Sequence, residues 1–266
     1  MTDSPGRPLA AIVLVPPAGP RRVLIGLAVL VAALLVCGAA VARGRAAAPE
    51  FIAIPLDAHA LRLFWRDDAG RPFRSFRRLD AWLHRRGERL EFAMNAGMYH
   101  ADGGPVGLLV IDGRELAPLN RDDGAGNFFL KPNGVFYVDA TGAHVVATED
   151  YPADAAGVRL ATQSGPLLLQ HGTIHPAFAP ASRSRHVRNG VGICAGRPVF
   201  AISRGKVTLH AFAAWFRDTL GCTDALYLDG AVSSLHSRAM RRSDARAALG
   251  PIVAVVGPEP PGRAGR

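Results

Sequence analysis

One aspartate ends an apolar stretch of the sequence and is followed directly by a glycine. Ala225 to Leu228 has the composition of a short buried strand, and Asp229 and Gly230 come next. A carboxylate at the end of a buried strand, with a glycine that admits a ligand, predicts an acid, a base or a metal ligand. Ser233 and Ser234 follow, and their hydroxyls would either cap a turn or bind the hydroxyl groups of a ligand.

A second candidate segment is rich in arginine. Residues 182–190 contain Arg183, Arg185 and Arg188, and an apolar strand at Val191 to Cys194 follows them. The planar guanidinium group suits phosphate, so several arginines here suggest an anion. Arg183 and Arg185 fit an exposed basic loop better, whereas Arg188, close to the strand, is the predicted binder.

A third candidate is the turn that begins at Asn95. Gly97 lies within it, and Gly103-Gly104-Pro105 follows shortly after. Glycines let backbone amides approach an anionic or sugar ligand closely. A tight loop with no ligand is the alternative explanation for the same residues.

The elements that must position these loops follow from hydrophobic spacing. Helical spacing predicts helices over 75–86 and 208–220, each closed by a glycine. Alternating or apolar runs predict strands at 51–65, 91–94, 107–111, 134–138, 143–148, 166–169, 191–194, 199–203, 225–228 and 252–256. Residues 50–258 contain no repeat and no long linker. We expect an α/β body of the α+β type: one domain with a mixed, strand-rich sheet core and two or three packed helices.

The N-terminal part of the chain is predicted to be a delivery segment. Residues 23–42 carry no charge and no proline, which is about the length that crosses a bilayer as a helix. Arg21 and Arg22 before it favour a cytoplasmic tail over 1–22 and an exported body. The segment is either a transmembrane anchor or a signal sequence cut near residues 42 or 48. We therefore expect a domain facing the periplasm or cell exterior, either anchored in the inner membrane or secreted, and a disordered tail over 259–266.

Charge and cysteine content narrow the function classes. The formal net charge of +9 falls to +5 without residues 1–45, which hold five arginines and one aspartate. The remaining arginines lack the clustering with aromatics that nucleic-acid binding favours. The densest run, 71–89, is expected to be a solvated helix face, with attraction to anionic envelope polymers or lipid headgroups left open. Cys194 and Cys222 are either a disulfide, which an exported protein permits, or two buried thiols.

Five short motifs in order resemble the phosphodiester glycosidase family. They are Asn95-x-Gly97-Met98-Tyr99, Pro105-x-Gly107, Gly165-Pro166, Arg188-Asn189-Gly190 and Leu228-Asp229-Gly230-x-x-Ser233-Ser234. Residues 120–121 and 126–134 resemble a bacterial branch of that family. The sequence departs from the family pattern at Ala231 and Val232, where glycines are usual, and at Asn189, where threonine is usual.

The resemblance implies hydrolysis of a sugar 1-phosphodiester at the glycosidic C–O bond, without a required cofactor. In that reaction Arg188 would hold the phosphate, and Asp229 would act as the base or stabilise the transition state. Loop amides near Gly97 and Gly165 would assist. The remaining predicted substrate contacts are Asn95, Ser164, Asn189, Gly230, Ser233, Ser234 and, as a second anion binder, Lys131.

Two rival interpretations remain at this stage. The same pocket could belong to a non-catalytic envelope module that binds a glycan or an anionic polymer. A metal-dependent hydrolase would use Asp229 together with His100, Asp102 or Asp112, although these residues lack a diagnostic spacing. The phosphodiester glycosidase interpretation does not require a divalent cation. In every case the expected partners are a carbohydrate or glycan phosphate and, through residues 23–42, a membrane.

Overall fold

The computed structural model describes residues 51–245 and 247–260. The predicted cytoplasmic tail, the apolar segment 23–42 and most of the predicted C-terminal tail lie outside these residues. Within the described ranges, no helix has the length and apolar character to cross a membrane.

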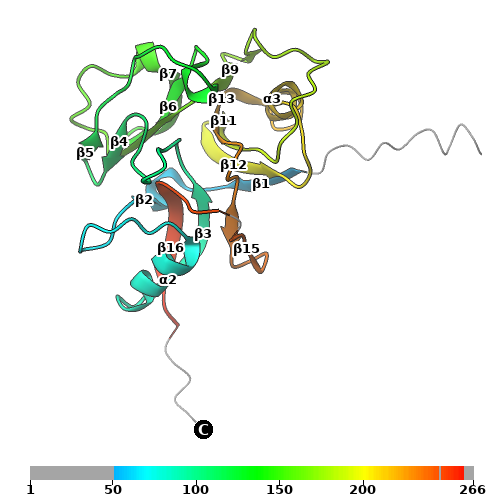
Figure 1. The fold of residues 1–266 in the computed structure, drawn as a ribbon. Coiled ribbons are helices and arrows are strands. Elements are labelled where there is room, and N and C mark those ends of the chain that lie inside the picture. Colours follow the sequence, from blue (N-terminus) through cyan, green and yellow to red (C-terminus); the bar gives the residue numbers. More distant parts are fainter. Residues whose placement is uncertain (1–50, 246, 261–266) are drawn as a thin grey trace, which may run out of the picture. The chain divides into compact units, whose positions relative to one another are not determined.

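The described strands form three sheets, and every pairing between them is antiparallel (Figure 1). The six-stranded sheet has the order β1 (Phe51–Pro55), β12 (Arg197–Ser203), β11 (Asn189–Cys194), β13 (Cys222–Asp229), β9 (Leu167–Gln170) and β10 (Thr173–Ile174). One five-stranded sheet has the order β15 (Arg242–Ser243), β14 (Leu235–Ser237), β3 (Glu88–Asn95), β16 (Ile252–Pro258) and β2 (Leu61–Phe64). The other has the order β5 (Arg114–Ala117), β4 (Leu109–Ile111), β8 (Leu160–Ser164), β6 (Gly134–Asp139) and β7 (Gly142–Ala147).

Two α-helices are described, α2 (Phe76–His84) and α3 (Leu209–Asp218). Each begins where the sequence places a hydroxyl cap: Ser75 accepts a hydrogen bond from the Arg78 amide, and Thr208 accepts one from the Ala211 amide. Helix α2 packs on β3, and α3 packs on β9 and β13 (Figure 1). Three short 3₁₀ helices, η1 (Ala58–Ala60), η2 (Asn127–Phe129) and η3 (Thr148–Asp150), complete the described elements.

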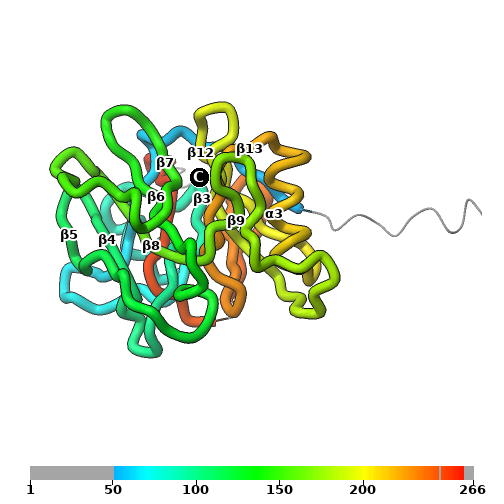
Figure 2. The backbone as a smooth tube through the Cα atoms, turned by 90° about the horizontal axis from the view of Figure 1, so that it is seen from above, coloured from blue at the N-terminus to red at the C-terminus, as the bar shows by residue number. Residues whose placement is uncertain are grey.

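The largest apolar core joins the three sheets. Phe92 of β3, Phe136 of β6 and Leu226 of β13 belong to one buried cluster. Strand β7 packs against β9, β11, β12 and β13, and Figure 2 shows β6 and β7 beside β9 and β13. This packing holds the sheet that contains β7 against the sheet that contains β11 and β13.

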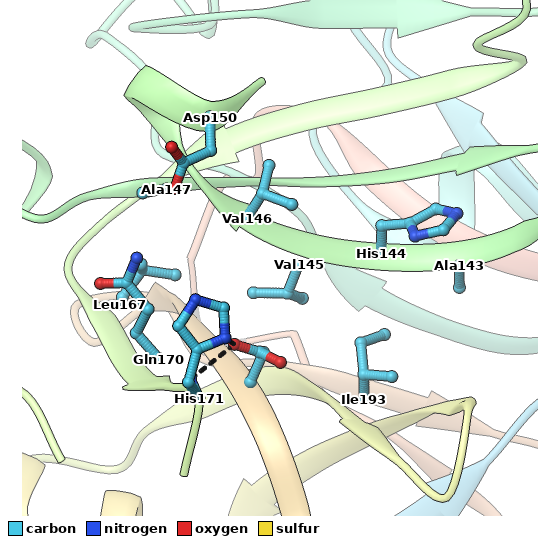
Figure 3. A pocket seen from close by; sticks show the side chains of 11 residues that line it. Ala143, His144, Val145, Val146, Ala147, Asp150, Leu167, Gln170, His171 and Ile193 are labelled. Atoms are coloured by element: carbon cyan, nitrogen blue, oxygen red, sulfur yellow. Dashed lines mark hydrogen bonds and ion pairs between the residues drawn. The ribbon is translucent and has the colours of Figure 1, made fainter. Parts of the chain in front are cut away.

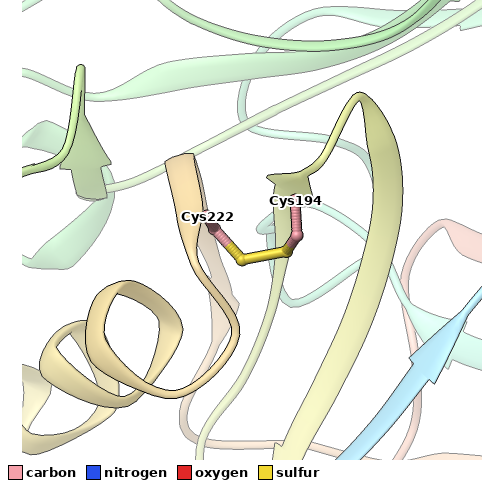
Figure 4. The surroundings of a disulfide bond; sticks show 2 residues. All are labelled: Cys194 and Cys222. Carbon is pink, nitrogen blue, oxygen red and sulfur yellow. A yellow bond between two sulfur atoms is a disulfide. The ribbon is translucent and has the colours of Figure 1, made fainter.

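The predicted strand-rich α/β body with two helices is confirmed. The expected mixed pairing of the sheet core is wrong, because the described strands form three sheets in which all pairings are antiparallel. The predicted strand over 51–65 is also two strands, since η1 interrupts it between β1 and β2. Cys194 and Cys222 face each other across β11 and β13 and form a disulfide, so the thiol alternative is wrong (Figure 4).

Candidate functional site

Asp229 is the last residue of β13 and lies opposite Asn189 in the pairing with β11. Its side chain is buried, with 8% of the residue exposed, and its Oδ1 accepts a hydrogen bond of 2.8 Å from the Ala231 amide. Burial raises the pKa of Asp229 above its ordinary value, while hydrogen bonds from the amides of residues 230–232 act in the opposite direction. The carboxylate is therefore more basic than a surface aspartate.

Arg188 is buried more deeply than Asp229, with 1% of the residue exposed. Its Nε donates to the Val207 carbonyl at 2.9 Å, Nη1 to the Tyr227 hydroxyl at 3.0 Å, and Nη2 to the Ser184 carbonyl at 3.1 Å. All three acceptors are uncharged. Within the described part of the chain, no carboxylate forms an ion pair with Arg188. A buried cation held only by neutral acceptors favours the arrival of an anion, and two of its five N–H groups are left to bind one.

Tyr227 connects Arg188 to the loop that follows Asp229. Burial raises the pKa of Tyr227 to about 12, so the hydroxyl stays protonated and keeps a hydrogen to donate while it accepts from Arg188. A Cβ atom built on Gly230 would lie 1.7 Å from the Tyr227 hydroxyl oxygen and 3.6 Å from Arg188 Nη1. The backbone of Gly230 thus lies against the Tyr227 hydroxyl and close to the guanidinium group.

Asn95 and Asn189 join the loops of two sheets. Asn95 Nδ2 donates to Asn189 Oδ1 at 3.2 Å, and Asn189 Nδ2 donates to the Asn95 carbonyl at 3.2 Å. Asn95 Oδ1 accepts from the Ser234 amide at 2.9 Å, and Ser233 Oγ lies 3.1 Å from Asn189 Oδ1. The predicted sugar-binding residues are therefore brought together, and they use these polar atoms to hold the loop after Asp229 in place.

Ser164 and the two candidate glycines pack close to this network. Ser164 Oγ donates to the Leu228 carbonyl at 2.9 Å, one residue before Asp229. The Gly97 amide donates to Thr162 Oγ1 at 3.0 Å, and a Cβ on Gly97 would lie 2.2 Å from the Gln163 carbonyl oxygen. A Cβ on Gly165 would lie 2.6 Å from the Phe128 carbonyl oxygen. Both glycines allow backbone segments to approach, and the Gly97 amide already has an acceptor within the protein.

Lys131 makes its contacts in a different place. Its ammonium group forms an ion pair of 2.7 Å with Asp123 and donates to the Arg121 carbonyl at 3.0 Å. The structure does not join Lys131 to Asp229 or Arg188 by any contact among the described residues.

The three residues that depart from the family pattern have different surroundings. Val232 is half-buried and packs against the apolar cluster beneath α2, which contains Phe73 and Leu79. Ala231 is exposed. Asn189, in place of threonine, supplies the paired hydrogen bonds to Asn95.

The residues named for a metal site are not gathered into one. Asp102 Oδ1 accepts from the Gly104 amide at 2.8 Å, and Asp112 lies in the turn between β4 and β5. Across the described ranges, no group of three or more His, Cys, Asp or Glu side chains is placed to hold a metal ion.

Cavities help to delimit the site. Arg188 lines a hollow of about 120 Å³ together with Ser182, Ser184 and His210. A larger cleft of about 500 Å³ lies at the opposite end of β13, near Asp224 and His171, which are joined by a hydrogen bond from the His171 amide (Figure 3). Because the buried carboxylate of Asp229 and the buried guanidinium of Arg188 lie at the other end of β13, we assign the chemistry to that end.

Tyr227 is the residue of the candidate site that the sequence reasoning missed. It stands two residues before Asp229 on the same strand, and the pairing with β11 shifts register between the two positions. A polar hydroxyl within an apolar strand, two positions before the candidate carboxylate, was the available indication.

Comparisons with known proteins agree with the motifs. The sequence model of the phosphodiester glycosidase family matches residues 88–251. The uncharacterized protein YigE of Escherichia coli K12 is 32% identical over 179 residues, which are 67% of this chain and 70% of that protein. The zebrafish N-acetylglucosamine-1-phosphodiester α-N-acetylglucosaminidase catalytic domain, solved in a form auto-inhibited by its pro-peptide, is 13% identical with a TM-score of 0.54. That match covers 79% of this chain and 85% of the zebrafish chain, and it concerns the fold.

Proposed function

Because the chain belongs to the phosphodiester glycosidase family, we propose that it is an extracytoplasmic hydrolase that cleaves the glycosidic C–O bond of a sugar 1-phosphodiester. One observation carries the proposal. A buried arginine without a carboxylate partner among the described residues lies beside the loop of a buried aspartate, with Tyr227 between them.

In this mechanism Arg188 binds the phosphate group through its two remaining N–H groups. The Tyr227 hydroxyl, which stays protonated, donates to a phosphate oxygen from the same side. These donors stabilise the negative charge that grows on the phosphate as the C–O bond breaks. A phosphate monoester leaves with the bonding electron pair, and a good leaving group of this kind lessens the need for a strong general acid.

Asp229 serves the anomeric carbon in the same proposal. Its carboxylate stabilises the positive charge of the oxocarbenium-like state and takes a proton from the attacking water, whose oxygen bonds to the carbon. The pKa of Asp229 is raised by burial, which makes it a better base than a surface aspartate once it is ionised. Activity should therefore rise with pH as Asp229 loses its proton.

Two features support an extracytoplasmic location. The Cys194–Cys222 disulfide is of a kind that persists in oxidising compartments and is rare in the cytosol. The uncharged apolar run at 23–42 has the length of a membrane-spanning or signal segment. An enzyme outside the cytoplasm would meet envelope glycans and phosphodiester-linked polymers.

The test is turnover by the full chain of a panel of sugar 1-phosphodiesters in ¹⁸O-labelled water, read by mass spectrometry. Cleavage of the C–O bond places the label in the free sugar, whereas cleavage of the P–O bond places it in the phosphate and contradicts the proposal. Asp229→Asn should lower kcat by about 10²–10⁴-fold in a folded protein. Unchanged turnover would remove Asp229 from the chemistry.

Arg188→Lys tests the phosphate clamp, because lysine keeps the charge and loses the planar fork. We expect a raised KM, with Arg185→Lys in the preceding exposed loop as the matched control that leaves KM unchanged. Equal kinetics for the two variants would exclude the clamp. If no substrate of the panel is turned over while glycans bind, the non-catalytic module becomes the better description.

A further inference from the structure

Two hollows lie on either side of Trp82, away from the Asp229 loop. One, of about 310 Å³, lies between the end of β2, Trp82 and the turn after β4. The other, of about 190 Å³, lies between Trp82, the hairpin of residues 66–72 and the exposed side of α2. We call the two hollows together the Trp82 groove.

The aromatic rings of this groove are fixed and carry guanidinium groups. Arg66 lies over Trp65 with 3.9 Å from its Cζ atom to the ring centroid, and Arg86 lies over Trp82 at 3.6 Å. The indole N–H of Trp65 donates to the Gly103 carbonyl at 2.8 Å, and that of Trp82 donates to Asp68 at 3.1 Å. Stacking on a held ring orients the planar donor fork of an arginine and reduces the freedom lost on binding.

The groove carries more positive charge than its own carboxylates neutralise. Arg71 pairs with Asp67, Arg86 pairs with Asp68, and Arg62 pairs with Glu88. Asp112 is a further carboxylate on the side of the larger hollow. Three other arginines that line the groove, Arg66, Arg78 and Arg85, are exposed and form no ion pair within the described part of the chain.

We propose that the Trp82 groove binds an anionic polysaccharide, with Arg66, Arg78 and Arg85 contacting its carboxylate or phosphate groups. Arginine forks donate paired hydrogen bonds to such groups, and a polymer that repeats an anionic group can engage arginines spaced along both hollows. The groove is separate from Asp229, so the proposal goes beyond the catalytic function and does not depend on it.

The observations favour a polysaccharide over a lipid surface. Binding in a membrane interface needs protruding apolar side chains as well as basic ones. Among the described residues, the exposed large apolar side chains are Leu116, which lines the larger hollow, and Met240, so the groove presents a single such side chain. The tryptophans of the groove are partly buried, and their N–H groups are bonded within the protein.

The proposal is tested with the full chain and polygalacturonate as the probe. Arg66→Gln, Arg78→Gln and Arg85→Gln are combined in one variant. The control combines Arg121→Gln, Arg197→Gln and Arg241→Gln, three exposed arginines that line neither hollow, and so changes the net charge equally. Three exposed contacts predict affinity weaker by roughly tenfold for the groove variant and little change for the control. The chain has three tryptophans, and two lie in the groove, so tryptophan fluorescence reports occupancy.

Two outcomes would overturn the proposal. Equal weakening in both variants would show that overall charge, not the groove, attracts the polymer. The second outcome is that the groove variant binds polygalacturonate as well as the unaltered protein does but no longer binds vesicles of phosphatidylcholine and phosphatidylglycerol. That result would identify the groove as a membrane-binding surface instead. Circular dichroism establishes that both variants are folded, and Arg78→Gln alone, measured against Arg121→Gln, repeats the comparison with the least disturbance.

Discussion

Replacing Gly230 by alanine should push the backbone at residue 230 away from the Tyr227 hydroxyl, which accepts a hydrogen bond from Arg188. The added Cβ atom would lie 1.7 Å from the Tyr227 hydroxyl oxygen, whereas side-chain Cβ atoms essentially never approach within 3.0 Å. Gly230 is not among the residues with positive φ, so the penalty comes from space and not from backbone conformation. An overlap of this size in a buried site should cost about 2–3 kcal/mol of unfolding free energy.

The cause of that loss can be isolated with Tyr227→Phe. Removing the hydroxyl alone takes one acceptor from Arg188 and should cost about 1.5–3 kcal/mol. It also removes the clash, because the next ring atom lies 3.1 Å from the same Cβ. Gly230→Ala should therefore cost only about 0.5 kcal/mol in the Tyr227→Phe background, giving a coupling energy of about 2 kcal/mol.

The assay is urea unfolding of the four proteins of this double-mutant cycle at pH 7. Gly157→Ala is the control, because its Cβ would meet no atom within 4 Å. Additive losses from Gly230→Ala and Tyr227→Phe would refute the contact between the hydroxyl and the loop. Turnover adds a second criterion: Gly230→Ala should add little further destabilisation in the Tyr227→Phe background, and the double variant should remain inactive, since the phosphate donor is absent.

Three further changes have defined outcomes. Replacing Cys194 and Cys222 by serine should lower the unfolding free energy by about 3–4 kcal/mol, because the disulfide closes a loop with a sequence separation of 28; an unchanged urea midpoint would contradict this. Asp229→Asn should raise the melting temperature at pH 7, because the raised pKa of Asp229 means that ionising this buried carboxyl opposes folding. The higher melting temperature of the variant should disappear as the pH falls below 3.8, the ordinary pKa, where the carboxyl is protonated in both the folded and the unfolded protein. A difference in melting temperature that does not change with pH would exclude this coupling between ionisation and folding. Val232→Gly should lower stability by about 1–2 kcal/mol through lost packing beneath α2; raised turnover of bulkier substrates would instead show that Val232 narrows the site.

Local patterns predicted the elements whose structure is decided locally. Both α-helices lie within the ranges predicted for them, and β6 and β7 pair at the positions predicted for two strands. Strand β8 was missed because three of its five buried residues are polar. Thr162, Gln163 and Ser164 are buried in it, and their side chains bond to neighbouring loops and strands, which a hydrophobic pattern does not reveal.

The position of the candidate site was predictable from the sequence, but its internal bonding was not. Asp229 and Arg188 were selected because each stands at the end of an apolar strand. The pairing of β11 with β13 brings those strand ends together, with a register shift between Asn189 and Gly190. Which residues touch a ligand and which support the loop depends on contacts between distant segments. Asn95 and Asn189, for example, are 94 positions apart and bond to each other.

The contacts of the loop after Asp229 explain why this chain keeps glycine at 230 but has alanine at 231 and valine at 232. A valine in a glycine-rich loop suggests a narrower pocket when only the sequence is considered. In the structure Val232 packs beneath α2 and Ala231 is exposed, so neither position requires glycine for lack of space. Gly230 does, because the Tyr227 hydroxyl occupies the place of its Cβ. Tyrosine at 227 and glycine at 230 are therefore coupled: a chain with the Tyr227 hydroxyl at this place needs glycine at 230, whereas the structure sets no such requirement at 231 and 232.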